Sequence, residues 1–159
     1  MASRPFIKVA VPLTGEEEVA AIREVVLSGN FVSGAKVEQF EREIAAQVGV
    51  SHAVAVNSCT AALHLAFAAM GLGPGEEVIV PPVTFFSTVT SVLHQGATPV
   101  FADVDAASFC LSADAVERVI TERTRAIVPV HVYGNAADMD AIMRVADTHK
   151  LVVIEDCAQ

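Results

Sequence analysis

The chain has 159 residues, 53% of them hydrophobic and 18% charged, with a formal net charge of −9. A chain of this length can bury roughly 70% of its unfolded surface, so the composition predicts a folded domain and excludes intrinsic disorder. Its ten basic side chains are scattered singly along the chain, which excludes a basic surface for nucleic acid.

The sequence also bears on location. No stretch reaches the roughly 18 consecutive apolar residues of a membrane span, and Lys8 and Pro12 interrupt the N-terminus too early for a signal peptide. Cys59, Cys110 and Cys157 are widely spaced and odd in number, which predicts neither a zinc site nor a disulfide framework. We therefore expect a reduced, cytoplasmic protein with no metal and no membrane partner.

The first 50 residues are expected to form an N-terminal helical arm. Amphipathic patterns predict helices at about 15–28 and 36–48, and no convincing strand follows residue 13. This arm is expected to pack outside the main sheet or on a partner chain.

From residue 51 to 159, short β-branched runs alternate with helical stretches. This alternation predicts a three-layer α/β/α fold, with helices on both faces of a mostly parallel sheet. The predicted strands are 52–57, 76–82, 98–104, 125–133 and 151–156, and the predicted helices are about 60–71, 86–95, 112–121 and 138–149. No helix follows the last strand, so the architecture is expected to be incomplete.

Ligands of open α/β sheets bind at the carboxyl ends of the strands. There, "NSCT" (57–60) opens a predicted helix, where hydroxyls and free backbone N–H groups either bind a phosphate or simply cap the helix. Within "TFFST" (84–88), Phe85 and Phe86 are either core residues or a stacking surface for a planar ligand. Asp156 ends an apolar strand, so its carboxylate needs either a protein partner or a ligand.

A thiol enzyme is a rival interpretation of the same edge. Cys59 would be its nucleophile and His131 its base, with the pKa of Cys59 lowered by the helix N-terminus. No sequence signature of a thiol enzyme supports this pair.

Taken together, three long stretches resemble one protein family. They are "NSCTAALHLAFAAMGLGPGEEVIVPPVTFFSTVTSVLHQGATPVFADVD", "TRAIVPVHVYGNAADMDAI" and "VIEDCAQ", preceded by "VPLTGEEEVAAIREVVLSGNFVSGAKVEQFERE". They are similar to the DegT/DnrJ/EryC1/StrS group of pyridoxal-phosphate (PLP) sugar aminotransferases, and the resemblance covers nearly the whole chain. It implies fold type I, here as a partial large domain at 51–159.

The resemblance also implies roles for individual residues. Ser58, Cys59 and Thr60 would hold the cofactor phosphate, although the family usually has glycine at the position of Cys59. The pyridine ring would stack on Phe85, pair through its nitrogen with Asp156, and have Gln159 nearby. Residues of "SGNFVSG" (28–34), namely Asn30, Phe31 and Gly34, would line a nucleotide-sugar site, often across a homodimer interface.

The implied reaction moves an amino group from an amino acid such as glutamate to a nucleotide-linked keto-deoxysugar. The family's lysine, which bonds to the cofactor, lies downstream of the "ED" strand. Lys8, Lys36 and Lys150 are the lysines of this chain, and none is expected to play that part. We therefore expect a fragment that is inactive by itself, truncated before that lysine. Two alternatives remain open, a non-catalytic binding or regulatory module and a PLP-dependent sugar dehydratase.

Overall fold

The computed structural model describes residues 11–159, which form two compact units, the first ending at Ala55 and the second beginning at Val56. Lys8 therefore lies outside the described residues. None of the described helices is both long enough and apolar enough to cross a membrane.

The first unit contains two helices, α1 (Glu16–Ser28) and α2 (Ala35–Val48). Each ends at a glycine in the left-handed conformation, Gly29 with φ 71° and Gly49 with φ 78°, where other residues are strained. The helices predicted at 15–28 and 36–48 are thus present, each within one residue of its predicted bounds.

The second unit contains a four-stranded sheet in the order β2-β1-β3-β4. The strands are β1 (Glu77–Val80), β2 (Thr98–Phe101), β3 (Thr124–Ile127) and β4 (Val152–Val153). All three neighbouring pairs are parallel, so every carboxyl end lies on the same edge of the sheet.

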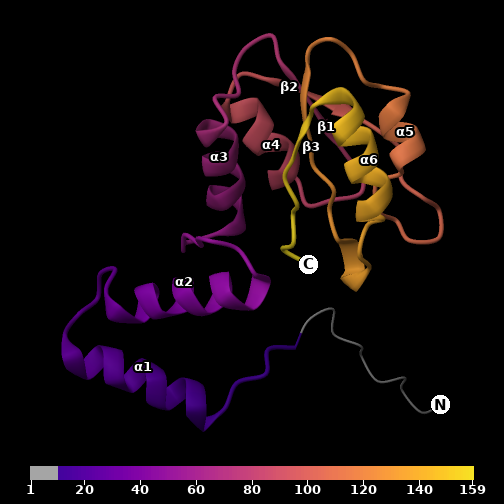
Figure 1. Cartoon of the computed structure of the whole chain (residues 1–159). Helices are drawn as coiled ribbons and strands as arrows, with labels where there is room; N and C mark the ends of the chain where they lie inside the picture. Colours follow the sequence, from indigo (N-terminus) through magenta and orange to yellow (C-terminus); the bar gives the residue numbers. More distant parts are fainter. Residues whose placement is uncertain (1–10) are drawn as a thin grey trace, which may run out of the picture. The chain divides into compact units, whose positions relative to one another are not determined.

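Four α-helices cover this sheet in two layers. They are α3 (Cys59–Ala69), α4 (Ser87–His94), α5 (Ala113–Glu117) and α6 (Met139–His149), with a short 3₁₀ turn η1 (Val132–Gly134) after β3. Figure 1 shows α3 and α4 on one side of the sheet and α5 and α6 on the other. This confirms the predicted three-layer α/β fold with a parallel sheet.

The core follows from the two-residue period of the strands. In β1, Val78 packs in the apolar cluster that contains Phe67 of α3, while its neighbour Ile79 packs in the cluster that contains Ile142 of α6. All four of these side chains are 0% exposed. The central strands are therefore apolar on both faces, as a buried parallel sheet requires.

The four observed strands are all shorter than predicted, and the last, which was predicted at 151–156, is only Val152–Val153. Two further elements also differ. Residues 52–57 form no strand, and the side chain of Val54 is 78% exposed. Helix α5 was predicted to reach 121 but ends at Glu117. The β-branched run Val119, Ile120 and Thr121 comes shortly after this end. Such residues lose side-chain freedom in a helix, which favours the observed turn.

Candidate functional site

Asp156 lies at the carboxyl edge of the sheet, as the sequence predicts. It pairs with Val130 in a parallel bridge just beyond the ends of β3 and β4. Its N–H donates to the carbonyl oxygen of Pro129 (2.9 Å), and its own carbonyl oxygen accepts from the N–H of His131 (3.1 Å). Two hydrogen bonds therefore hold the backbone of Asp156 to the segment 129–131, and the residue is only 3% exposed.

The carboxylate of Asp156 accepts hydrogen bonds at both oxygens. Oδ2 accepts from the Thr88 hydroxyl (2.7 Å), and Oδ1 accepts from the Ala158 N–H (3.1 Å) and faces the Cys59 thiol (3.6 Å). No Lys, Arg or His of residues 11–159 forms an ion pair with it. A buried carboxylate without a cationic partner is costly, so this position fits a positively charged ligand.

The N-terminus of α3 adjoins this carboxylate through Cys59. Ser58 is the N-cap residue, and its hydroxyl accepts from the Ala61 N–H (3.2 Å). The N–H groups of Cys59 and Thr60 lie in the first turn, before the hydrogen bonds within the helix begin. They have no partner among the described residues. Free N–H groups at a helix N-terminus are suited to a phosphate. Ser58 therefore acts as a cap, and the same turn also offers an anion site.

The pKa of Cys59 is raised and not lowered as the thiol-enzyme hypothesis required. Partial burial is the first cause and the adjacent Asp156 carboxylate the second. The proposed base, His131, has other partners at both ring nitrogens, namely Glu155 and the Ala137 N–H. The hypothesis of a Cys59–His131 pair is therefore wrong.

An open hollow lies beside the sheet edge and is lined by Thr84, Phe85, Val132, Tyr133 and Gln159 together with Pro82 and Val83. The ring of Phe85 is 57% exposed and contacts that of Phe86, with centroids 4.3 Å apart. Only Phe85 of the two lines the hollow. An exposed aromatic face in a concave site is suited to a planar ligand.

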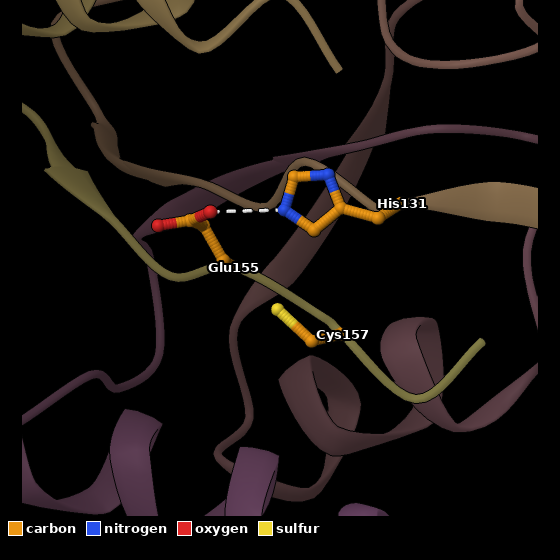
Figure 2. A group of neighbouring side chains, drawn as sticks. All are labelled: His131, Glu155 and Cys157. Atoms are coloured by element: carbon orange, nitrogen blue, oxygen red, sulfur yellow. Dashed lines mark hydrogen bonds and ion pairs between the residues drawn. The ribbon is translucent and has the colours of Figure 1, made fainter. Parts of the chain in front are cut away.

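His131, Glu155 and Cys157 form a second group of polar atoms near this edge (Figure 2). Their donor atoms lie within 4.8 Å of one another, a spacing that raises the question of a metal site. His131 Nδ1 accepts from the Ala137 N–H (3.1 Å), so the ring proton is on Nε2, which donates to Glu155 (2.9 Å). A metal at Nε2 would need that proton on Nδ1. The group is therefore better explained as a hydrogen-bonded link between the ends of two strands.

The predicted substrate residues lie in the first unit. Asn30, Phe31 and Gly34 line a hollow between α1 and α2, together with residues of both helices. Lys36 borders the same hollow, where it pairs with Glu24 at 2.9 Å. The structure thus places these three residues together at one cavity.

The described lysines are Lys36 and Lys150. Lys36 belongs to the first unit and is paired with Glu24. Lys150 is the left-handed residue after α6, with φ 56°, and precedes β4. Asp156 follows β4, so Lys150 and Asp156 lie at opposite ends of that strand.

A family model matches residues 12–159, and its description is the DegT/DnrJ/EryC1/StrS aminotransferase family. The chain belongs to this family. The resemblance stated from the sequence is thereby confirmed, and the members of this family are aminotransferases.

Among curated relatives, the chain is 52% identical over 153 residues to the spore coat polysaccharide biosynthesis protein SpsC of Bacillus subtilis. It is 46% identical to the GDP-perosamine synthase of Caulobacter vibrioides and 40% identical to a UDP-4-amino-4-deoxy-L-arabinose–oxoglutarate aminotransferase of Shewanella sediminis. These matches cover 96%, 100% and 98% of this chain but only 39%, 43% and 40% of the relatives. The chain therefore spans about two fifths of their length.

Solved structures that resemble this chain also include aminotransferases. The aminotransferase of Psychrobacter cryohalolentis superimposes with a TM-score of 0.89 at 43% identity, over 93% of this chain and 38% of that one. The structure of NtdA from Bacillus subtilis, with bound cofactor PMP, superimposes with a TM-score of 0.84 at 38% identity, over 89% of this chain and 32% of that one. The fold is that of the PLP-dependent aminotransferases of fold type I.

Sequence reasoning gave no role to Thr88, Tyr133 or Glu155, which the structure places at or beside the site. Thr88 falls inside the helix predicted at 86–95, but its contact with Asp156 joins residues 68 positions apart, so no local spacing in the sequence indicates it. Tyr133 carries no signal either, since its left-handed backbone (φ 54°) is visible only in the structure.

Proposed function

We propose that this chain forms the cofactor-binding part of a PLP-dependent sugar aminotransferase. The observation that carries the proposal is the buried Asp156 carboxylate, which has no cationic partner among residues 11–159 and lies beside the free N–H groups of α3. One PLP molecule offers complementary groups for both features, a pyridine nitrogen that can be protonated and a phosphate dianion.

Different residues of this chain would bind different parts of the cofactor. The N–H groups of Cys59 and Thr60, with the Ser58 hydroxyl, would bind the phosphate. Phe85 would stack on the ring, and Gln159 would lie close to it at the same hollow. When bound, PLP supplies an electron sink for a substrate carbon that loses a proton. Asp156 would favour this chemistry by keeping the ring nitrogen protonated.

For the substrate we propose a nucleotide-linked keto-deoxysugar, with an amino acid such as glutamate as amino donor. Two observations support this choice. The names of the relatives include GDP-perosamine synthase and an aminotransferase of a UDP-linked aminosugar that uses oxoglutarate, the keto acid related to glutamate. The hollow at Asn30, Phe31 and Gly34 would supply part of the sugar-nucleotide site, in a homodimer whose partner shares it.

We further propose that no lysine of this chain forms the covalent bond to the cofactor. The position of Lys150, at the other end of β4 from Asp156, supports this proposal. The partial large domain at 51–159 would then hold the ring and phosphate, while the residue that moves the substrate proton would come from elsewhere in the protein.

The test is an assay of the full-length protein with PLP, glutamate and a nucleotide-linked keto-deoxysugar. Formation of the aminosugar, detected by mass spectrometry, should match the release of oxoglutarate, and Asp156→Ala should abolish both. A sugar product that has lost water without gaining nitrogen would instead indicate a dehydratase. Cofactor binding without turnover of any such sugar would indicate a binding module.

A further inference from the structure

We propose that Thr88 is a positioning residue that orients the Asp156 carboxylate toward the ring nitrogen of the cofactor, and that Thr84 holds the Thr88 hydroxyl in the required direction. This inference rests on the proposed function, because it needs a ring nitrogen at Asp156. Nothing in the family relationship or in the names of the relatives assigns a role to either threonine.

The contact between Thr88 and Asp156 is buried and direct. Thr88 lies in the first turn of α4, is 0% exposed, and places its hydroxyl 2.7 Å from Oδ2 of Asp156. The two residues are 68 positions apart in the chain, so this hydrogen bond joins α4 to the segment that follows β4. A short O–H···O contact to a carboxylate is among the stronger hydrogen bonds in proteins.

The direction of the hydroxyl chain follows from counting protons. A carboxylate only accepts hydrogen bonds, so the single proton of the Thr88 hydroxyl is given to Asp156. The contact of 2.8 Å between the hydroxyls of Thr84 and Thr88 must then have Thr84 as the donor. Both bonds point toward Asp156, and bonds aligned in this way strengthen each other.

The two oxygens of the carboxylate have separate donors. Oδ2 is held by Thr88, and Oδ1 by the Ala158 N–H, with the Cys59 thiol beside it. These contacts on both sides fix the plane of the carboxylate and leave fewer directions open for a ligand. Without the Thr88 hydroxyl, Oδ2 would lose its side-chain donor and the carboxylate could turn away from the ring nitrogen.

The rival explanation is that Thr88 only fills space between α4 and the sheet. Thr88→Val keeps the shape and removes the donor, whereas Thr88→Ser keeps the donor and loses a methyl group. Thr84→Val removes only the outer bond of the chain. Thr90→Val is a matched control on the same helix, since no hydrogen bond joins the side chain of Thr90 to Asp156.

The deciding readout is the affinity for two probes measured on the full-length protein. Pyridoxamine phosphate binds without a covalent bond and carries the ring nitrogen, and its 1-deaza analogue carries a C–H group at that position. We expect Thr88→Val to weaken the binding of pyridoxamine phosphate about tenfold, as for loss of one hydrogen bond to a charged group. The affinity for the 1-deaza analogue should stay within about twofold of the wild type. Thr88→Ser should bind both probes with nearly the wild-type affinity. Thr84→Val should weaken the binding of pyridoxamine phosphate by about threefold, and Thr90→Val should change the affinity for neither probe.

Equal weakening of both probes by Thr88→Val would show a packing role and overturn the inference, as would unchanged binding of both. If Thr88→Val does not fold, Thr84→Val decides, because its loss must again be confined to the probe with the ring nitrogen. A wild-type protein that binds neither probe would contradict the proposed function itself. A wild type that binds both equally would show that Asp156 does not contact the ring nitrogen.

Discussion

The thiol of Cys59 lies 3.6 Å from Oδ1 of Asp156, although 97 residues separate the two in the chain. The parallel topology explains this contact. Helix α3 begins and β4 ends at the same edge of the sheet, so a helix N-terminus and a strand C-terminus meet there. The first residue of α3 and the buried carboxylate of Asp156 are thereby brought into contact.

The first prediction concerns the reactivity of Cys59. Burial and the Asp156 carboxylate raise its pKa, so less thiolate is present at pH 8 than in an unstructured peptide. We expect iodoacetamide to label Cys59 more slowly than a free cysteine peptide, as followed by mass spectrometry of the digested protein. Asp156→Asn should speed this labelling, because it removes one of the causes. Labelling faster than that of the peptide would contradict the pKa shift.

The second prediction separates capping from phosphate binding. Ser58→Ala should lower the free energy of unfolding by about 1 kcal/mol, because the Ala61 N–H loses its acceptor. It should also weaken the binding of pyridoxal phosphate. Ser112→Ala is the matched control, since Ser112 caps α5 in the same way through the Ala115 N–H. We expect this control to lose stability but to keep its affinity for the cofactor. An equal loss of affinity in both variants would contradict a phosphate site at α3.

The third prediction uses two adjacent aromatic residues. Phe85 lines the hollow with Gln159, whereas Phe86 does not, and both rings are more than half exposed. Phe85→Ala should therefore weaken the binding of pyridoxal phosphate by about fivefold, which corresponds to about 1 kcal/mol of lost stacking. The free energy of unfolding should change little. Phe86→Ala should leave the affinity within about twofold of the wild type. The reverse order would place the stacking surface on Phe86. Fluorescence titration of the cofactor measures both.

The fourth prediction concerns Glu77, at the amino end of β1, opposite the carboxyl edge of the sheet where Asp156 lies. Hydrogen bonds from Thr121 and then Arg123 lower the pKa of Glu77, which is 5% exposed. Because the folded pKa lies below the ordinary value of 4.5, this stabilisation is present above about pH 4.5 and is lost as the pH falls through the folded value. Glu77→Gln should cost about 1–2 kcal/mol at pH 7, and the difference from the wild type should shrink in acid.

The control for this fourth prediction is Glu122→Gln. Glu122 is exposed, and its side chain forms no hydrogen bond or ion pair with the described residues. Urea unfolding at several pH values measures both variants. A cost of Glu77→Gln that stays constant down to pH 3 would refute the assigned hydrogen bonds.

The two-residue and 3.6-residue periods of the sequence predicted most of this fold, because they report which face of each element is buried. They failed at 52–57, where Val54 alternates with polar or small residues yet is exposed. Alternation shows that a segment suits a strand, but a strand also needs a neighbouring strand edge, and no described strand pairs with this segment.

At the candidate site, the sequence predicted where Asp156 lies but not which residues contact it. The position of Asp156 at the end of an apolar run was readable, because parallel strands share one carboxyl edge. Its partners were not, since the contacts of Thr88 and Cys59 with Asp156 join elements that are distant in sequence. The direction of the Cys59 pKa shift was also missed, because it depends first on burial and then on a carboxylate, and only the fold provides both.

The claim that none of the chain's lysines bonds to the cofactor has its own test. After incubation with pyridoxal phosphate and reduction with borohydride, we expect no stoichiometric pyridoxyl group on Lys8, Lys36 or Lys150. Peptide mapping by mass spectrometry detects such a group. Complete modification of one of the three would show that this chain supplies the covalent residue.

The central claim is that Asp156 pairs with the protonated ring nitrogen of the cofactor. It is tested most directly by the ¹⁵N NMR signal of pyridoxal phosphate labelled at the ring nitrogen and bound to the full-length protein. We predict the shift of a protonated pyridinium in the wild type at neutral pH, and that of an unprotonated pyridine in Asp156→Asn. The same unprotonated shift in both proteins, or the same protonated shift in both, would contradict this account.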